Sequence, residues 1–274
     1  MTADTKTYPT RYGPMIGLKG DRFVSRSLEV YGEFCPGEAK LFAQVIRPGM
    51  TVVEAGANIG THSIPLARLC APGPLYLFEP QQRVFQLLCA NLANNGVTNA
   101  IAYPEACGAE TGFALIPNLN YGAQDNFGGV SVRPIDGASE GARVRVTPLD
   151  SLGLKTCHLL KVDVEGFEPQ LLAGATGTIT RCRPLIYIEN DRPAHQQEVI
   201  NQISALGYRL YWHTPTLFSP DNFNGATEDV FGGIGSLNMF CIPAEITARL
   251  PESAPIDPAN WTAPGAPADR SPAA

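Results

Sequence analysis

The sequence has little positive charge and no basic run. Its 5 lysines and 15 arginines are scattered along 274 residues, and the formal net charge is −6. Proteins that bind nucleic acid or an anionic membrane surface through charge need a basic patch, so we predict no nucleic-acid partner. No apolar run approaches the ~18 residues that span a bilayer, and residues 1–15 lack the apolar core of a secretion signal. We therefore predict a chain without a transmembrane segment.

Paired cysteines are also missing, because the count of seven is odd and no two of them form a C-x-x-C motif. Several lie inside apolar segments, where cysteine packs as a small hydrophobic residue. These features argue against a disulfide framework and favour free thiols in a reducing compartment. We predict a cytoplasmic protein, and the hydrophobic content of 44% predicts a globular one with a full core.

Short apolar runs alternate with helical patterns from about residue 50 onward. Such alternation is typical of right-handed β-α-β crossovers and a mostly parallel sheet. The last two runs have no helical pattern between them, so we expect the seventh strand to be antiparallel. We predict an α/β fold with a doubly wound, Rossmann-like sheet of seven strands. The expected strands are 50–56, 74–80, 99–108, 157–166, 183–191, 208–215 and 235–243.

The two ends and one internal segment break this alternation. Residues 1–45 are expected to form an amino-terminal extension or cap with one helix over 33–46, and residues 46–245 the main domain. Residues 108–150 are rich in Gly and Asn, and we predict a β-hairpin or flap there, over the carboxyl ends of the strands. Residues 246–274 are rich in Pro and Ala, which predicts a disordered or loosely draped tail.

A glycine-rich turn follows the first strand, in the segment E-A-G-A-N-I-G from Glu54 to Gly60. It has neither the G-x-G-x-x-G spacing of a dinucleotide site nor the G-x-x-x-x-G-K-[ST] pattern of a P-loop. The carboxylate of Glu54 would repel a phosphate and suits a ligand with an amino group and hydroxyls. S-adenosylmethionine is such a ligand. We predict that Glu54, Gly56, Asn58 and Gly60 bind it.

Two further strand ends support this interpretation. Glu79 ends the second strand, 19 residues after Gly60, and its carboxylate is expected to accept both ribose hydroxyls. Glu105 and Ala106 end the third strand, where backbone and side chain are expected to hold the adenine edge. The alternative is that the glycines serve only a tight turn between strand and helix.

Five segments together resemble the FkbM family of S-adenosylmethionine-dependent methyltransferases: VVEAGANIGTHS, FEP, TPLDSL, LLKVDVEGFEPQLLAGA and PLIYIEND. The resemblance spans roughly residues 28–242, and KVDVEGFE is its most specific part. It implies a class I methyltransferase fold and O-methylation of a sugar, glycolipid or secondary-metabolite hydroxyl, so that the partner is a small-molecule acceptor. Glu54 stands where many relatives have aspartate, which preserves the charge.

Methyl transfer to oxygen requires a positioned hydroxyl and a group that accepts its proton. Asp163, after the fourth strand, is expected to orient the methionine end of the cofactor or the acceptor hydroxyl. Glu165 or Glu189 would accept the proton, although Glu165 could instead serve as a charge at a helix amino terminus. His213, at the end of the sixth strand, is a further candidate base, and Tyr31 is expected to close over the cofactor. Both could equally be structural.

The ends of the fourth and fifth strands also carry hard oxygen ligands. Asp163 with Glu189 and Asn190 resembles, in layout only, the divalent-metal site of catechol-type O-methyltransferases. Ligands of this kind suit Mg²⁺, and a bound cation would lower the pKa of an acceptor hydroxyl. Mg²⁺ is therefore a second candidate cofactor, held by these three residues.

Three other functions remain open from the sequence. An N-methyltransferase would keep the cofactor and depend less on a strong base. A non-catalytic binding protein would keep the fold without turnover. An NAD-dependent oxidoreductase is disfavoured by the glycine spacing. The sequence leaves open the acceptor, the methylated position and the oligomeric state, a homo-oligomer included.

Overall fold

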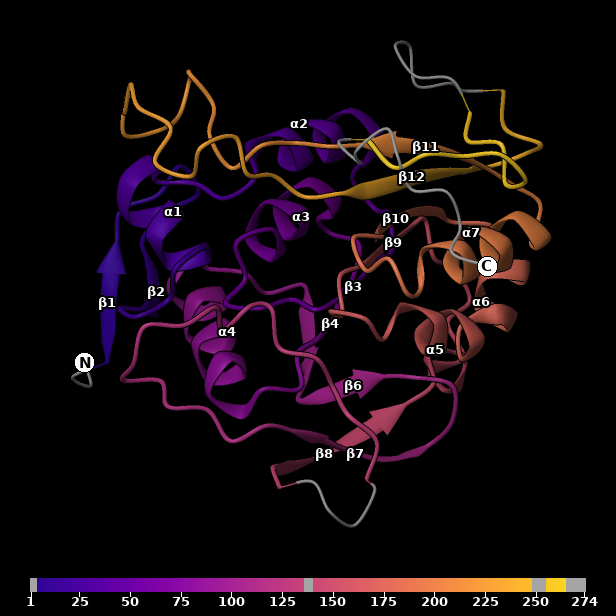
Figure 1. The fold of residues 1–274 in the computed structure, drawn as a ribbon, viewed down its shortest axis with the longest axis horizontal. Coiled ribbons are helices and arrows are strands. Elements are labelled where there is room, and N and C mark those ends of the chain that lie inside the picture. The colour runs from indigo at the N-terminus through magenta and orange to yellow at the C-terminus, as the bar shows by residue number, and fades with distance from the viewer. Residues whose placement is uncertain (1–3, 136–139, 248–254, 265–274) are drawn as a thin grey trace, which may run out of the picture.

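A seven-stranded sheet runs through the protein (Figure 1), whose computed structural model describes residues 4–135, 140–247 and 255–264. From one edge to the other its strands are β11 (Tyr208–His213), β12 (Asn238–Pro243), β10 (Leu185–Glu189), β9 (Leu159–Val162), β3 (Val52–Ala55), β4 (Leu75–Phe78) and β5 (Ala100–Tyr103). β12 lies antiparallel between β10 and β11, and the other neighbouring strands are parallel. The predicted doubly wound α/β sheet with an antiparallel seventh strand is therefore confirmed.

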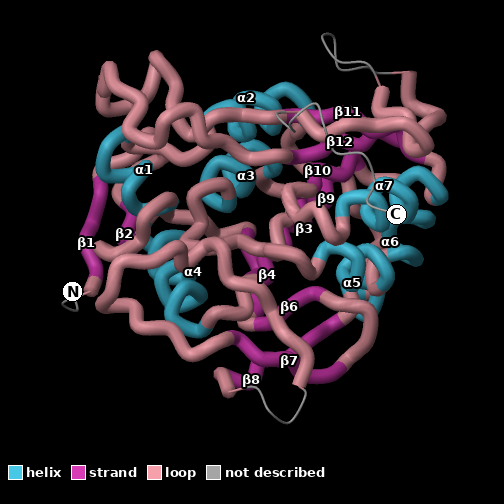
Figure 2. The backbone as a smooth tube through the Cα atoms, in the orientation of Figure 1, coloured by secondary structure: helices cyan, strands magenta, loops and turns pink. Residues whose placement is uncertain are grey.

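Helices lie on both sides of this sheet (Figure 2). One face packs against α2 (Pro36–Val45), α3 (Ser63–Cys70) and α4 (Gln82–Asn94), and the other against α5 (Glu168–Ala173), α6 (Thr176–Cys182) and α7 (Gln196–Ala205). Successive side chains of a strand point to opposite faces, so Val52 belongs to the first core and Val53 to the second. Strands buried on both faces read as continuous apolar runs, which is the pattern that the sequence has here.

The predicted third strand, 99–108, divides at Pro104. Residues before it form β5, and residues after it form β6 (Glu105–Cys107) in a second sheet with β8 (Ala142–Thr147) and β7 (Gly112–Ile116). Proline has no N–H to donate to a neighbouring strand, so it ends the pairing in the central sheet. β7 and β8 pair antiparallel, so the hairpin predicted within 108–150 is present, although residues 136–139 lie outside the described part. A short 3-10 helix, η1 (Leu149–Leu152), leads from β8 toward β9.

The amino-terminal segment contains more regular structure than its sequence pattern predicts. Besides α2 it has a hairpin of β1 (Thr5–Tyr8) and β2 (Met15–Leu18), and the helix α1 (Val24–Tyr31). The side chain of Asn91 in α4 accepts the backbone N–H of Ile16 at 2.7 Å and donates to its carbonyl at 2.9 Å. This amide fixes the hairpin on α4, where it lies in Figure 1.

Part of the predicted tail packs on the sheet edge. In the described stretch 255–264, the N–H of Ile256 donates to the carbonyl of Leu210 in β11 at 2.7 Å. The ring of Trp261 lies 5.8 Å from that of Trp212. The rest of the predicted tail, 248–254 and 265–274, lies outside the described residues. Among the helices that the structure describes, none is both long and apolar enough to cross a membrane.

Candidate active site

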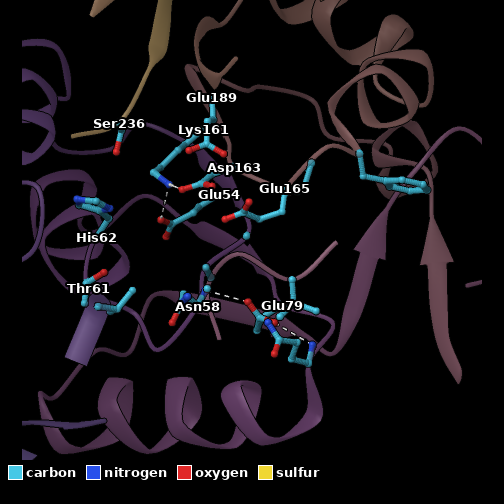
Figure 3. A pocket seen from close by; sticks show the side chains of 18 of the residues that line it. Glu54, Asn58, Thr61, His62, Glu79, Lys161, Asp163, Glu165, Glu189 and Ser236 are labelled. Carbon is cyan, nitrogen blue, oxygen red and sulfur yellow. Dashed lines mark hydrogen bonds and ion pairs between the residues drawn. The ribbon is translucent and has the colours of Figure 1, made fainter. Parts of the chain in front are cut away.

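A cavity of about 380 Å³ lies at the carboxyl ends of β3, β4, β9 and β10 (Figure 3). Ligand sites in open α/β sheets lie at this edge, and the volume is in the range of small-molecule sites. The cavity is strongly acidic, because seven carboxyl side chains line it and only two lysine or arginine side chains do. The acidic residues are Glu54, Glu79, Glu105, Asp163, Glu165, Glu189 and Asp191, and the basic ones are Lys161 and Arg192.

The turn after β3 has a backbone conformation that requires glycine. Gly56 has a φ of 83°, and a Cβ atom there would lie 1.7 Å from the backbone carbonyl oxygen of Asp163. Gly60 has a φ of 92°, in the region where other residues are strained. Asn58 has a φ of 49°, which asparagine tolerates better than most residues. Of the residues predicted to bind the ligand at this turn, Gly56 and Asn58 line the cavity, whereas Gly60 shapes the turn without lining it.

Glu79, directly after β4, is held by the backbone on both carboxylate oxygens. Its Oε2 accepts the N–H of Asn58 at 3.0 Å, and its Oε1 accepts the N–H of Gln81 at 2.8 Å. The residue is 3% exposed, and this burial raises the pKa of Glu79 to about 7. A carboxylate oxygen can accept a second hydrogen bond, so Glu79 can still bind the hydroxyls of a ligand in the cavity.

Lys161 of β9 is a buried cation at the base of the cavity. It faces Glu54 across β3 and β9 in register, with its Nζ 3.6 Å from Glu54 Oε1. It also donates to Asp163 Oδ2 at 3.2 Å, and Glu54 in turn accepts the hydroxyl of Ser63 at 2.6 Å. The sequence prediction missed Lys161, although a lysine inside the apolar run LLKV signals a buried, paired charge.

Three carboxylates gather where β9 and β10 end. Asp163, Glu165 and Glu189 each offer an oxygen within 4.8 Å of the others. Burial, with the nearby charge of Asp163, raises the pKa of Glu165 to about 8, even though Arg192 donates a hydrogen bond to it. Burial and the same charge raise the pKa of Glu189 well above its usual range. The Oε2 atom of Glu189 is buried and has no hydrogen-bond partner among the described residues.

The predicted adenine side of the cavity is formed by β6 and the segment between β7 and β8. Glu105 and Ala106 line the cavity, and Glu105 accepts a hydrogen bond from the hydroxyl of Thr147. The side-chain amide of Gln81 donates to the carbonyl of Phe127 at 2.9 Å, which ties the segment to the start of α4. Asn126, Gly128, Val130 and Val132 of this segment also line the cavity. The predicted flap therefore contributes to the cavity wall.

Besides Gly60, three of the predicted site residues are not brought into this cavity. Tyr31 is buried, and its hydroxyl accepts the N–H of Val230 at 2.9 Å, so that it joins α1 to the loop before β12. The side chain of Asn190 donates to the carbonyl of Gln196 at 3.3 Å and so turns toward α7. His213 Nδ1 lies 2.8 Å from the hydroxyl of Tyr187, and the ring lines a separate groove beside α2. In each case the side chain makes a hydrogen bond to another part of the protein instead of facing the cavity.

His62, just before α3, lines the cavity between aromatic neighbours. Its ring packs near those of Phe34 and Phe42, and the residue is 4% exposed. Burial, with the charge of Lys161, lowers the pKa of His62 to about 3. At neutral pH this ring is therefore a neutral hydrogen-bonding group.

Solved structures of low sequence identity resemble this fold. A methyltransferase FkbM from Methylobacillus flagellatus KT is 18% identical, with a TM-score of 0.49 over 74% of this chain and 50% of that chain, so this chain spans about half its length. A precorrin-6y C5,15-methyltransferase from Geobacter metallireducens GS-15 is 9% identical, with a TM-score of 0.45 over 74% of this chain and 84% of that one. A SAM-dependent O-methyltransferase from Thermotoga maritima is 11% identical, with a TM-score of 0.41 over 76% of this chain and 65% of that one.

The family assignment rests on the sequence itself. No curated protein sequence matches the chain. The model of the methyltransferase FkbM domain, however, matches residues 54–210, which is more than half of the 274 residues. The match begins at Glu54 and includes Glu79, Asp163 and Glu189, which line the cavity. The chain therefore belongs to the methyltransferase FkbM family.

Proposed function

We propose that the protein is an S-adenosylmethionine-dependent O-methyltransferase that acts on a hydroxyl of a sugar, glycolipid or secondary metabolite. The observation that carries the proposal is the pairing of two features in one cavity. Glu79 lies at the end of β4, and the carboxylates Asp163, Glu165 and Glu189 lie where β9 and β10 end. The first suits the ribose of the cofactor, and the second suits an acceptor hydroxyl beside it.

The charges of the cavity fit this cofactor better than a phosphate-bearing one. Seven carboxyl groups against two lysine or arginine side chains favour a ligand with positive charge and repel phosphate. S-adenosylmethionine has an ammonium group and supplies a methyl group on a positively charged sulfur. Glu54, Gly56 and Asn58 would hold its methionine end at the turn, and Glu79 its ribose. Glu105 and Ala106 would lie along the adenine.

The residues at the ends of β9 and β10 would then act on the acceptor. Asp163 would orient the hydroxyl, because its carboxylate lies in the cavity and is anchored by Lys161. Glu165 or Glu189 would accept the proton. Because the pKa of Glu165 is about 8 and that of Glu189 is also raised, both groups would become better proton acceptors as the pH rises above neutrality. His213 lies in another groove and would act only indirectly.

Binding of S-adenosylhomocysteine is the first test. Calorimetric titration of the purified protein should give a dissociation constant in the micromolar range, which is common for enzyme ligands. The same titration with Mg²⁺ and with EDTA tests the second predicted cofactor, because a metal requirement would appear as a difference between the two conditions. Binding would justify a screen of hydroxylated acceptors with release of S-adenosylhomocysteine as readout. Absence of binding under every condition would leave a family member without the cofactor and would overturn the proposal.

Glu79→Ala should weaken the binding of S-adenosylhomocysteine by about 1–3 kcal/mol, because a charged hydrogen-bond partner of the ribose is lost. The pH dependence gives a second readout. Since the pKa of Glu79 is about 7 in the free protein, its carboxylate form is lost as the pH falls below 7. The affinity of the wild type should then fall by up to about tenfold per pH unit from this group.

Other carboxyl groups of the cavity titrate in the same range, so the comparison between variants isolates Glu79. The affinity of Glu79→Ala should depend less steeply on pH between 6 and 8 than that of the wild type. Glu110→Ala, at a solvent-exposed position, serves as the matched control and should behave as the wild type. If the affinities of Glu79→Ala and the wild type depend on pH with the same slope, the ribose does not bind at Glu79.

A further inference from the structure

The side chain of Lys161 lies between the carboxylates of Glu54 and Asp163. It points away from the core in which the adjacent residues of β9 are packed. Leu160 and Val162 pack in the core on the side of α5 to α7, so Lys161 between them points to the opposite face of the sheet. There its Nζ lies 3.6 Å from Glu54 Oε1 and 3.2 Å from Asp163 Oδ2. Figure 3 marks these interactions with dashed lines. The side chain is 2% exposed. This is a fully desolvated ammonium group in the wall of the cavity.

The surroundings keep this group charged. Burial alone would lower the pKa of Lys161, but the attraction of Asp163, Glu54 and Glu38 outweighs it and raises the pKa. Removing an ammonium group from water is costly unless carboxylates compensate it. A carboxylate oxygen lies within 4 Å of its Nζ on each side, so Lys161 acts as a cation in this cluster.

A second cation, Arg192, lies beside the carboxylate of Glu165 in the same cluster. Arg192 donates a hydrogen bond to Glu165 and lies 3.3 Å from Asp191. Two of the three carboxylates in the cluster, those of Asp163 and Glu165, thus already have a cation of the chain beside them. One oxygen of the third carboxylate, Glu189 Oε2, is buried and has no hydrogen-bond partner among the described residues.

This arrangement does not fit the metal site that the sequence predicts. Of the expected ligands Asp163, Glu189 and Asn190, the amide of Asn190 turns toward α7, and Asp163 Oδ2 is bonded to Lys161. A divalent cation prefers oxygen ligands, and each carboxylate still offers an oxygen within 4.8 Å of the others, but those of Asp163 and Glu165 already have a cation of the chain beside them. Placed here, it would also lie close to the charge of Lys161 and be repelled by it.

We propose that Lys161, together with Arg192, is the built-in counter-cation of the Asp163–Glu165–Glu189 cluster and takes the electrostatic role that a divalent metal would otherwise have. The ammonium group holds Asp163 in the cavity and limits the repulsion among the three carboxylates. On the proposed function, methyl transfer to the acceptor hydroxyl then requires no divalent cation. Lys161 is a positioning residue in this scheme, since it acts through Asp163.

The test uses Mn²⁺ alone as the probe, with the free ion counted by its paramagnetic resonance signal and no cofactor present. Lys161→Met should bind Mn²⁺ roughly tenfold or more tightly than the wild type, because the cluster loses a nearby positive charge. Lys161→Arg keeps the charge and should bind Mn²⁺ as weakly as the wild type. Lys155→Met removes a solvent-exposed lysine and is the matched control, with no expected gain.

Two further variants locate the effect. Adding Asp163→Asn to Lys161→Met should abolish the gain in Mn²⁺ affinity. If Lys161→Met alone does not fold, Glu54→Gln with Lys161→Met restores the charge balance of the buried pair and leaves the cluster intact. Tight Mn²⁺ binding by the wild type, or a gain that persists with Asp163→Asn, would overturn the proposal. Because no cofactor is present, the result is independent of whether S-adenosylhomocysteine binds.

Discussion

Gly56→Ala is expected to destabilise the fold and to abolish binding of S-adenosylhomocysteine. The added Cβ would lie 1.7 Å from the backbone carbonyl oxygen of Asp163, on the neighbouring strand end. That oxygen belongs to the backbone and cannot rotate away, so β3 and β9 would have to separate. The φ of 83° adds strain for any residue with a side chain. Together we expect a loss of about 2–6 kcal/mol in the free energy of unfolding, measured by chemical denaturation.

The sequence alone suggests a different reason for the need for glycine, namely space for the ligand. Gly49→Ala separates the strain of a positive φ from the contact with Asp163. Gly49 has a φ of 88° but nothing within 4 Å of its Cβ position. We expect that control to lose only the conformational part, about 1–2 kcal/mol. Equal losses for the two variants would mean that the contact with Asp163 relaxes without cost. The role of Gly56 would then lie with the ligand after all.

Asp163→Asn is expected to lower turnover by about 100-fold or more, the range for losing a group that acts on the proton or hydroxyl in the transition state. Binding of S-adenosylhomocysteine should change far less, because Glu79, Gly56 and Asn58 remain. The change is isosteric, so the amide oxygen can still accept from Lys161. Turnover would be measured as release of S-adenosylhomocysteine with the best hydroxyl acceptor of the screen.

The comparison of turnover with affinity decides the role of Asp163. An equal loss of both would make it a ligand of the cofactor only, at the methionine end. Thermal unfolding of the variant serves as the control for folding, since Asp163 is one of the two carboxylates nearest to Lys161. An N-methyltransferase would show a smaller loss of turnover on removal of Glu165 or Glu189, because an amine acceptor depends less on a base.

The site residues that follow the strands could be predicted, because the carboxyl ends of parallel strands lie at the same edge of the sheet. Apolar runs locate β4 and β9 in the sequence, and Glu79 and Asp163 follow directly from them. The glycine turn is equally local, since Gly56 and Asn58 lie in one continuous segment after β3. The carboxyl edge of the sheet and part of the cavity wall therefore follow from pattern alone.

What could not be predicted depends on partners that are distant in sequence or on the opposite side of the chain. Asn190 directly follows Glu189, but successive residues leave a strand on opposite sides, and α7 holds the amide. Tyr31 bonds to a residue 199 positions away, and no local pattern indicates such a pair. The apolar run around Lys161 signals a buried charge, but its partner Glu54 is identified only when β3 is placed beside β9. Pro104 was a local signal for the division of the third strand that the pattern of apolar residues concealed.

The packing of residues 255–264 on β11 has a consequence for association between molecules. β11 is an edge strand of the sheet, and the unpaired backbone groups of such a strand are a template for adding a strand from another chain. Here the carbonyl of Leu210 is already bonded to Ile256, and Trp261 packs beside Trp212. This segment therefore covers part of the edge, and at Leu210 it occupies a backbone group that an added strand would need.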